Sequence, residues 1–556
     1  MCNPDSRYTI GVDFGTLSAR AVLVDVSNGR EAASAVYEYP HGVIDGALPS
    51  TGEKLPPLWA LQDPADYLEA LEAVLRRVTS APGVKPERII AIGIDFTAST
   101  VIPVDSGWKP LRFDPRFAGE KNAWVKLWKH HAAQKYADRI NDLYARTGGG
   151  WMDVVCGRMS GEAFLPKVWQ TLDEAPEVYE AADSFVEAGD WITMQLTGKP
   201  VRSYVIASYK SCYTDEYGYP PDAFLEQLDP RLRGLFARKC RGPIVRAGET
   251  AGFVTSEAAE RFGLPEGIPV AAPMPDAHIG GYPVGLSNDG DMFGIFGTSN
   301  CYFLMSAEKR DVPGICGCVP DGILPGFYGY EAGLCCFGDH FAWAAENLST
   351  AGYLKEAEER GITPLRLLIE KASALAPGES GLIALDWWNG NRSILVDSGL
   401  SGLIIGMNLQ TRPEHIMRAL IEATAFGTKM IFENFRENGI DIKRFIAAGG
   451  VPLKDPFTMQ LFSDVLGIDI EVSSTRQAAA LGDAIHAAAV VGPARGGYAG
   501  ISEAQKRMRP GVSAVYRPDP AAAGIYGRLF SEYRILHDTF GRGGNDVMKR
   551  LREIGN

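Results

Sequence analysis

Short apolar runs alternate along this chain with longer amphipathic stretches. The runs are often β-branched, and they predict strands at residues 89–94, 268–272, 292–296 and 445–448. Helical periodicity of the apolar positions predicts helices at residues 65–78, 414–434 and 476–491. Strands that alternate with helices in this way are typical of an α/β fold.

Two regions rich in glycine and proline interrupt this alternation, at residues 40–57 and 313–333. Because these residue types punctuate regular structure, we predict a long functional loop in each region. The chain has 556 residues, whereas an ordinary domain has about 100–200. We therefore expect two or more domains.

An internal repeat links the two halves of the chain. Residues 12–20 (VDFGTLSAR) are matched by residues 295–302 (IFGTSNCY), and each segment predicts a strand, a Gly-Thr turn with hydroxyls and a second strand. A single turn of this kind is common hairpin chemistry, since glycine takes a positive φ without steric cost. Two copies with open backbone N–H groups favour a pair of anion-binding turns. We predict two related α/β domains that each bring one glycine hairpin to a shared cleft.

Composition and charge narrow the function classes. Hydrophobic residues make up 46% of the chain and charged residues 22%, as in ordinary soluble proteins. The net charge of −13 argues against nucleic acid or anionic lipid as a partner, because both need a basic surface. No apolar stretch approaches the roughly 18 residues that span a bilayer, and the first residues lack a signal pattern. We expect a cytoplasmic protein with no membrane partner.

The nine cysteines include Cys316-Gly-Cys318 and the adjacent Cys335 and Cys336. Neither pair has the C-x-x-C spacing of a zinc site, and an odd count in a cytosolic chain favours reduced thiols. We predict buried thiols here, with no metal site and no disulfide.

The first hairpin carries residues suited to a nucleotide phosphate and its cation. Asp13 lies beside the turn, where its carboxylate can hold Mg²⁺ through water, since Mg²⁺ takes one or two carboxylates together with phosphate oxygens. Gly15 opens the turn, and Thr16, Ser18 and Arg20 can donate to phosphate. An aspartate at a turn also serves as a simple turn former, and the local sequence does not separate these alternatives.

Two later segments add candidate residues. Asp276 follows the run at 268–272, at the carboxyl end of a strand, where α/β proteins place functional groups. It could cap the helix that begins there, act as a base, or do both, since a helix N-terminus stabilises a carboxylate. Gly449 and Gly450 follow the run at 445–448, and glycine lets a flat base or a phosphate approach the backbone. These segments complete one predicted nucleotide cleft.

In this order along the chain, these segments resemble the FGGY carbohydrate kinases of the actin-like ATPase superfamily. The resemblance rests on residues 11–20, 296–300, 447–467 and 480–492 together with the Asp276 segment. It implies an α/β fold of two actin-like (ribonuclease H-like) ATPase domains with an inter-domain cleft. We accordingly expect an N-terminal domain at 7–287, a C-terminal ATP-binding domain at 288–500 and a helical extension at 501–556.

Further segments resemble the branch of this family that phosphorylates L-ribulose. They are DFTAST at 95–100, LWKHH at 127–131, YKS at 209–211, GICG at 314–317, PGFYGYEAG at 325–333, FGD at 337–339 and AW at 342–343. The resemblance implies transfer of a phosphoryl group from ATP, with Mg²⁺, to the 5-hydroxyl of L-ribulose. The product is L-ribulose 5-phosphate, formed in arabinose use.

The resemblance also assigns roles at the sugar. Asp276 corresponds to the catalytic aspartate of the family, as general base to the 5-hydroxyl. Ala98, Lys210 and Glu331 correspond to residues that line the sugar pocket together with Asp276. In isolation Lys210 reads as a surface lysine, so its role depends on the resemblance.

On the nucleotide side, Gly297 and Thr298 correspond to the second phosphate hairpin. Gly449 and Gly450 correspond to glycines beside the adenosine. Leu17 departs from the family pattern, since many relatives carry a second hydroxyl at that position, and this puts one phosphate contact in question.

Three points stay open at this stage. Another FGGY kinase, acting on D-ribulose, ribitol or xylulose, shares every nucleotide residue and differs only at the sugar wall. A nonenzymatic actin-like ATP switch needs polymerisation surfaces or a peptide-binding region, whereas the residues after Gly500 are too few for a further domain of usual size. The oligomeric state is the third, with a homodimer among the alternatives.

One aromatic cluster, from Trp124 through Trp128 to His131, admits two interpretations. Its side chains can shape the wall of the sugar pocket. The interpretation we favour is an amphipathic helix that packs its tryptophans in the core.

Overall fold

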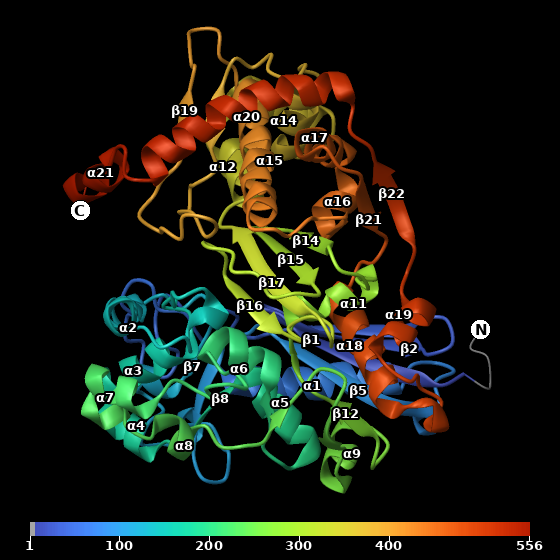
Figure 1. Ribbon diagram of the computed structural model, residues 1–556. Helices are drawn as coiled ribbons and strands as arrows, with labels where there is room; N and C mark the ends of the chain where they lie inside the picture. The colour runs from blue at the N-terminus through green and yellow to red at the C-terminus, as the bar shows by residue number, and fades with distance from the viewer. Residues whose placement is uncertain (1–5, 556) are drawn as a thin grey trace. The chain divides into compact units, whose positions relative to one another are not determined.

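A computed structural model describes residues 6–555, which form two compact units (Figure 1). Unit 1 comprises the described residues up to Ser287 together with Gly317–Gly329 and Gln477–Pro510. Unit 2 comprises Asn288–Cys316, Tyr330–Arg476 and the described residues from Gly511 onward. The units differ from the predicted domains on the C-terminal side, since residues 477–510 belong to unit 1 and the predicted extension divides after Pro510.

The main sheet of unit 1 mixes antiparallel and parallel strands. Its order is β11-β12-β5-β1-β2-β3, with β13 paired to β5. Neighbours β1, β2 and β3 are antiparallel, whereas β5 runs parallel to β1 and to β12. The strands are β1 (Tyr8–Phe14), β2 (Ser18–Asp25), β3 (Glu31–Glu38), β5 (Ile89–Phe96), β11 (Thr250–Phe253), β12 (Pro269–Ala271) and β13 (Met274–Pro275).

Alternation of side chains along β1 decides which helix covers each face of this sheet. Ile10, Val12 and Phe14 are fully buried and share one apolar core with the buried face of helix α1 (Pro64–Thr79). Asp63 caps that helix, since its carboxylate accepts from Ala65 N at 3.0 Å. The core of unit 1 therefore lies between the sheet and α1.

The other face of β1 receives helix α18 (Ala478–Val491), which lies beside β1 and β5 (Figure 1). A Cβ atom at Gly11 would collide with the backbone of Ala480, and one at Gly93 with that of Asp483. Glycine is needed at both strand positions because the helix backbone lies directly against them. This packing is the reason that residues 477–510 belong to unit 1.

A small sheet and a group of helices complete unit 1. The sheet has the order β4-β7-β6-β8, from β4 (Leu61–Gln62), β6 (Val101–Val104), β7 (Val125–Lys126) and β8 (Ser184–Glu187). The helices are α2 (Gln134–Thr147), α3 (Phe164–Glu174), α4 (Pro176–Ala181), α5 (Ala188–Thr197), α6 (Tyr204–Ser211), α7 (Asp222–Leu228), α8 (Leu235–Lys239), α9 (Ser256–Phe262), α10 (Asp276–Ile279), α11 (Gly281–Val284) and α19 (Ile501–Met508).

The predicted helix around Trp124 and Trp128 is wrong. Val125 and Lys126 form strand β7, paired to β4 and β6, and the chain then turns toward His131. Trp124 and Lys126 are both buried, because the strand lies inside the sheet and neither of its faces is solvated. A short strand that is buried on both faces has no polar side to mark its period of two, so periodicity alone does not distinguish it from a helix.

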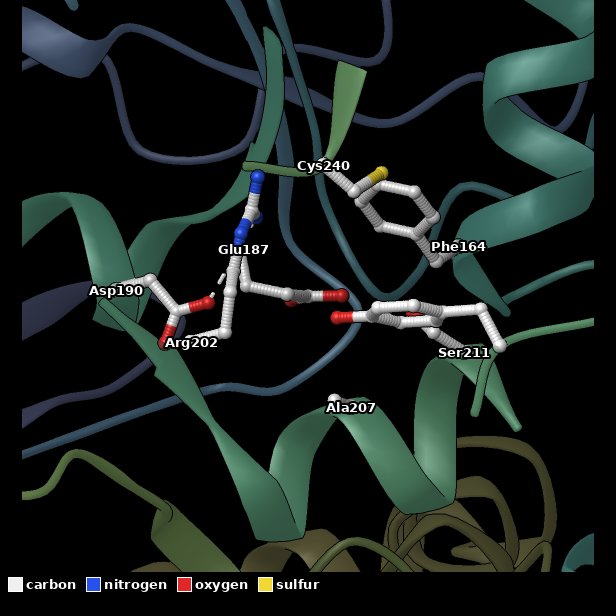
Figure 2. Close-up of a pocket in the computed structure, with 8 residues that line it drawn as sticks. Phe164, Glu187, Asp190, Arg202, Ala207, Ser211 and Cys240 are labelled. Carbon is white, nitrogen blue, oxygen red and sulfur yellow. Dashed lines mark ion pairs between the residues drawn. The ribbon is translucent and has the colours of Figure 1, made fainter. Parts of the chain in front are cut away.

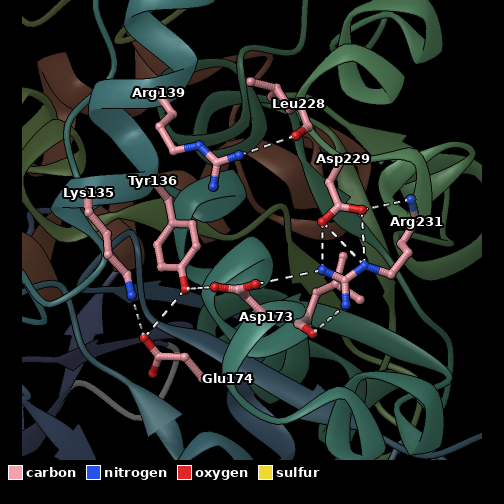
Figure 3. Close-up of polar contacts among 9 residues, drawn as sticks. Lys135, Tyr136, Arg139, Asp173, Glu174, Leu228, Asp229 and Arg231 are labelled. Carbon is pink, nitrogen blue, oxygen red and sulfur yellow. Dashed lines mark hydrogen bonds and ion pairs between the residues drawn. The ribbon is translucent and has the colours of Figure 1, made fainter.

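The outer ends of α2 and α3 carry a solvated polar network (Figure 3). Arg231 forms an ion pair with Asp229, in which Nη2 donates to Oδ2 at 2.6 Å, and a second ion pair with Asp173 at 3.7 Å. The Tyr136 hydroxyl donates to Asp173 at 2.8 Å. Exposed pairs of this kind are worth about 0–1 kcal/mol each, so they add little to stability.

Unit 2 repeats the strand plan of unit 1. Its strands follow the order β17-β15-β14-β20-β21-β22, with β14, β20 and β21 parallel and β15 antiparallel to β14. When the five strands of each sheet are numbered by their order in the chain, both sheets have the spatial order 3-2-1-4-5. These strands are β3-β2-β1-β5-β12 in unit 1 and β17-β15-β14-β20-β21 in unit 2. The prediction of two related α/β domains is confirmed, while the cleft between them stays a prediction.

The strands of this plan in unit 2 are β14 (Asp291–Phe296), β15 (Asn300–Ser306), β17 (Tyr328–Leu334), β20 (Arg444–Ala448), β21 (Ile470–Ser473) and β22 (Val512–Tyr516). Its helices are α12 (Gly338–Leu348), α13 (Ala351–Glu359), α14 (Pro364–Ser373), α15 (Pro413–Glu437), α16 (Gly450–Lys454), α17 (Pro456–Leu466), α20 (Pro520–Gly541) and α21 (Val547–Gly555). Helix α15 is buried along most of its length, and the long α20 crosses the same unit near α15 and α17 (Figure 1).

Apart from the helix around Trp124 and Trp128, the strands and helices expected from periodicity are present. The region at 40–57 is a loop with only isolated bridges, as predicted. The region at 313–333 is not one long loop, because it contains β16 (Gly317–Pro320) and most of β17. Buried aromatic and β-branched residues such as Val319 and Tyr330 form strands there despite the glycines between them. Across residues 6–555, no helix is long and apolar enough to cross a membrane.

Candidate functional site

The first glycine turn joins β1 to β2 as predicted. Gly15 N donates to Ser18 O at 3.0 Å and closes the turn. The backbone carbonyl of Thr16 accepts from the Gln62 side chain at 2.7 Å, and its hydroxyl accepts from the Trp128 indole at 3.1 Å. Because the hydroxyl oxygen of Thr16 is the acceptor of this hydrogen bond, its O–H remains able to donate to a ligand.

Asp13 and Arg20 lie opposite each other across this hairpin. They are cross-strand partners, and Arg20 Nε is 3.7 Å from Asp13 Oδ2. Arg20 also approaches the Ser18 hydroxyl at 3.5 Å. Leu17 at the tip has 61% of its surface exposed, and only its carbonyl is engaged, by Tyr39 N at 2.9 Å. The turn thus presents a carboxylate and a guanidinium side by side.

Three more aspartates surround Asp13 in unit 1. Asp95 is its register partner on β5, and Asp276 begins α10 directly after β13, which pairs with the end of β5. Asp483 comes from α18, whose backbone lies against Gly93, two residues before Asp95 on the same face of the strand. A single acidic cluster therefore forms from segments at both ends of the chain.

Burial governs the protonation of this cluster. Asp95 and Asp483 are fully buried, and the polar groups that interact with their carboxyls belong to the acidic cluster itself. Burial raises the pKa of both well above the usual range, and the charges of Asp13 and Asp276 add to this rise. Burial also raises the pKa of Asp13, against the lowering by Arg20. Asp95 and Asp483 can hydrogen-bond to each other when one of them carries a proton.

Asp276 has a different environment from its buried neighbours. It is partly exposed, and its Oδ1 accepts from Ala277 N at 2.8 Å. The N-cap of the short helix is Pro275, so Asp276 is the first helical residue rather than its cap. A backbone donor and contact with solvent both favour the ionised carboxylate, which is the form that a general base needs.

The residues predicted to line a sugar pocket are divided between the units. Ala98 lies in the loop after β5, and Lys210 lies on α6, and both belong to unit 1 with Asp276. Lys210 is half-buried, with Nζ 5.9 Å from the centre of the Tyr209 ring. Glu331 is half-buried on β17 and belongs to unit 2.

The second glycine turn, in unit 2, joins an equivalent strand pair but is one residue shorter than the first. Gly297 N donates to Ser299 O at 3.1 Å. The start of α12 lies against the turn, since Phe337 N donates to Thr298 O at 2.9 Å and Gly338 N to Gly297 O at 3.1 Å. The Thr298 side chain is exposed and available to a ligand. Asp339 is the aspartate at this turn: its N–H donates to Thr298 O at 3.4 Å and its side chain is exposed, whereas Asp13 at the first turn is half-buried.

Gly449 brings the glycine pair against the second turn. Its φ is 108°, a conformation that favours glycine, and a Cβ there would lie 2.7 Å from Phe296 O. Gly450 begins α16, and a Cβ at this residue would face open space. Unit 2 thus gathers Gly297, Thr298, Gly449 and Gly450 into one backbone-lined surface.

No set of three or more His, Cys, Asp or Glu side chains within residues 6–555 has the geometry of a metal cage. Mg²⁺ bound with a nucleotide does not need such a cage, because it keeps several waters and takes one or two carboxylates plus phosphate oxygens. Asp13 fits this requirement, since its carboxylate is 14% exposed beside the phosphate-type turn. The donor set is therefore compatible with a nucleotide-bound Mg²⁺.

Sequence reasoning missed Asp483 and gave Asp95 no role. Asp95 lay inside the recognised DFTAST segment, but nothing in that segment marks a buried carboxyl. Asp483 stands in the run AAALGDAIHAAAVV, where one acid among small apolar residues is a usable signal of a buried functional group. Of the two cysteine pairs, Cys318 and Cys336 are buried thiols as predicted, whereas Cys316 and Cys335 are only half-buried; Cys2 lies outside the described residues.

Comparison with known families matches both parts of the chain. Residues 8–281 match the N-terminal domain of the FGGY family of carbohydrate kinases, and residues 292–491 match its C-terminal domain. A protein named Ribulokinase from Halalkalibacterium halodurans is 48% identical over 99% of this chain and 98% of its own length. One of the same name from Mycolicibacterium smegmatis is 43% identical over 98% of this chain and 96% of its own length.

Solved structures show the same fold at lower identity. A ligand-bound xylulose kinase from Lactobacillus acidophilus has a TM-score of 0.80 at 19% identity, covering 97% of this chain and 99% of that one. A gluconate kinase from the same species has a TM-score of 0.79 at 19% identity with the same coverage. The chain belongs to the FGGY family of carbohydrate kinases.

Proposed function

We propose that this chain transfers the terminal phosphoryl group of ATP to the 5-hydroxyl of L-ribulose, giving L-ribulose 5-phosphate. The observation that carries the proposal is the similarity, over almost the whole chain, to proteins named Ribulokinase. The acidic cluster and the two glycine turns supply the groups that such a transfer needs. The proposed pathway role is arabinose use.

Asp276 is the proposed general base. It is the aspartate with a backbone donor and contact with solvent, whereas Asp95 and Asp483 are buried and hold their protons to higher pH. As a carboxylate it can accept the proton of the 5-hydroxyl while that oxygen attacks phosphorus. A general base of this kind contributes roughly 10²–10⁴-fold to the rate.

Positioning supplies the larger share of the rate. Phosphoryl transfer demands little covalent chemistry from the protein, and holding the reactants in line supplies about 7–11 kcal/mol of the barrier. We propose that Ala98, Lys210 and Glu331 orient the sugar through its hydroxyls and ketone. A polar site of this kind rejects a sugar that lacks a matching hydroxyl, because its own groups would be left unpaired.

The two glycine turns are the proposed phosphate-binding elements. Gly15, Thr16, Ser18 and Arg20 would donate to phosphate from unit 1, and Gly297 with Thr298 from unit 2. Gly449 and Gly450 would lie beside the adenosine. When bound with ATP, Mg²⁺ held by Asp13 through water would neutralise phosphate charge.

A substrate panel tests this proposal. ADP release is measured with L-ribulose, D-ribulose, D-xylulose and ribitol at equal concentration, and without any sugar. We expect the highest kcat/KM with L-ribulose, and a phosphate ester at O5 in the ³¹P and ¹³C spectra of the product. A higher kcat/KM with another sugar would overturn the substrate. ADP release that is equally fast without sugar would favour an ATP switch and overturn the kinase proposal.

A further inference from the structure

The loop of residues 97–100, which carries Ala98, is tightly built and buried. Ser99 has a φ of 63°, an uncommon conformation for a residue other than glycine, and it is only 3% exposed. The Thr100 hydroxyl donates to Thr97 O at 2.7 Å, so the loop is closed on itself. Backbone in such a conformation persists only where the surrounding structure holds it.

A buried lysine holds one side of this loop. Lys167 lies on α3 and is fully buried, and its ammonium donates to Ser99 O at 2.6 Å and to Leu127 O at 2.7 Å. Leu127 directly follows β7. The lysine therefore fastens the 97–100 loop to the small sheet through two carbonyl oxygens. On the same helix, Asp173 belongs to the solvated network of Figure 3, so the two ends of α3 differ sharply in environment.

A buried glutamate holds the other side. Glu187 ends β8 and is 4% exposed, and its Oε2 accepts from Thr100 N at 3.0 Å. The next residue, Ala188, donates its N–H to Thr100 O at 2.8 Å. Both polar backbone groups of Thr100 are thus held by one short segment.

Glu187 also faces a small cavity, lined with it by Asp190, Arg202, Ser211 and Cys240 among others (Figure 2). The cavity volume is about 10 Å³, the space of roughly one water molecule. A pentulose cannot enter so small a space, so this cavity is not a sugar pocket. Glu187 Oε1 has no hydrogen-bond partner among residues 6–555. Among these residues, the carboxylate is therefore held by the hydrogen bond from Thr100 N to Oε2.

The charges of Lys167 and Glu187 are linked to each other and to Lys210. Burial lowers the pKa of Lys167 and raises that of Glu187. The negative charge of Glu187 partly restores the pKa of Lys167, and the positive charge of Lys167 partly restores that of Glu187. The charge of Lys210 lowers both pKa values. The three groups therefore lie within one electrostatic environment, next to the loop that carries Ala98.

We propose that Lys167 and Glu187 are positioning residues that hold the 97–100 loop, and through it Ala98, in the geometry that binds the sugar. Neither residue is assigned a contact with substrate. This inference rests on the proposed function, in which Ala98 lines the sugar pocket. It assigns a specificity role to two buried groups, one on α3 and one on β8, that the transfer reaction itself does not use.

The test compares Lys167→Met with Lys126→Met, a matched control. Lys126 is an equally buried lysine on β7, but its ammonium donates to Lys167 O at 3.1 Å and to Thr171 Oγ1 at 2.8 Å, and not to the loop. Loss of a buried charged donor leaves two carbonyls unpaired in Lys167→Met. We expect the sugar KM to rise about tenfold or more, with the ATP KM and kcat within about threefold. Lys126→Met should leave the sugar KM within about twofold of the unchanged protein.

Glu187→Gln is the second variant, because Lys167→Met could fail to fold. The glutamine keeps the size and an acceptor for Thr100 N–H but removes the charge, so we expect a rise in sugar KM of about three- to tenfold. Equal rises in the sugar and ATP KM, or an unchanged sugar KM in folded Glu187→Gln, would overturn the proposal. The assays use whichever sugar has the highest kcat/KM, so a different preferred sugar overturns the substrate proposal alone.

Discussion

The two glycine turns join equivalent strand pairs but differ by one residue in length and in the groups around them. In unit 1, Asp13, Asp95, Asp276 and Asp483 gather beside the turn, and burial raises the pKa of the two innermost carboxyls, Asp95 and Asp483. In unit 2, the turn is surrounded by the backbone of Gly338 and Gly449 and by apolar rings. Under the proposed function, the first turn would combine phosphate binding with proton and cation chemistry. The second turn offers backbone donors and the Thr298 hydroxyl, with the exposed Asp339 beside it.

Among the variants that test this contrast, Asp276→Asn is expected to have the largest effect on activity. The amide keeps the size of the side chain but cannot accept a proton, so kcat should fall by at least about 100-fold while the sugar KM changes little. Steady-state kinetics with saturating ATP measures both values. Asp173→Asn, in the solvated network of Figure 3, is the control and should keep kcat within about twofold. A near-normal kcat in Asp276→Asn would remove this residue from its proposed role.

Gly449→Ala tests the backbone character of the unit 2 surface. A Cβ would lie 2.7 Å from Phe296 O at a φ of 108°, so the second turn must shift. We expect the ATP KM to rise about tenfold and Tm to fall by several degrees, from about 1–3 kcal/mol of strain. Gly450→Ala is the matched control, because its Cβ faces open space and Tm should stay within about 1 °C. Equal loss of Tm in both variants would contradict the steric account.

Arg20→Ala and Thr298→Ala compare the two turns directly. Arg20 offers a charged fork to phosphate, whereas Thr298 offers one hydroxyl. We expect the ATP KM to rise about tenfold in Arg20→Ala and about threefold in Thr298→Ala, with the sugar KM unchanged in both. Isothermal titration with a nonhydrolysable ATP analogue checks the order. A larger rise in the ATP KM in Thr298→Ala than in Arg20→Ala would contradict the proposal that the first turn contributes more to phosphate binding.

Asp483→Asn tests the buried carboxyl pair through the pH dependence of stability. The folded chain holds the Asp483 proton to higher pH than the unfolded chain does, because burial raises its pKa. Between the unfolded and folded pKa values, the unfolded chain has released this proton, so the free energy of unfolding falls as pH rises. The asparagine of Asp483→Asn does not titrate, so this pH-dependent loss of stability disappears, and its amide can donate to Asp95.

We therefore expect Asp483→Asn to raise Tm by about 2–4 °C near pH 8 and by less near pH 5, since a gain of about 1 kcal/mol produces a shift of that size. Calorimetry across this pH range gives the slope directly. A Tm gain that is the same at every pH would show that packing, and not the proton, is responsible.

Leu17→Ser has the smallest expected effect. The leucine stands where the second turn has Ser299, but only its carbonyl is engaged and its side chain is 61% exposed. We expect the ATP KM to change by less than about twofold. A marked fall in ATP KM would show that a second hydroxyl at this position binds phosphate.

The sequence predicted the turns better than the acidic cluster, for a physical reason. A Gly-Thr turn between two apolar runs is local chemistry, and both turns formed where 12–20 and 295–302 indicated. Asp95 and Asp483 meet only because α18 packs on β5, and periodicity does not identify which helix covers which face. Lys167 and Glu187 were missed for the same reason, since their partners are backbone groups of a distant loop. The strand at Val125 and Lys126 was misread because both of its faces are buried.

The most direct test of the central claim is a crystal structure of Asp276→Asn with L-ribulose and ATP bound. The account predicts the sugar O5 within hydrogen-bond reach of the residue 276 side chain, at about 2.6–3.2 Å, and nearest to the terminal phosphate. A sugar bound with O5 away from residue 276, or with another hydroxyl facing the phosphate, would contradict it.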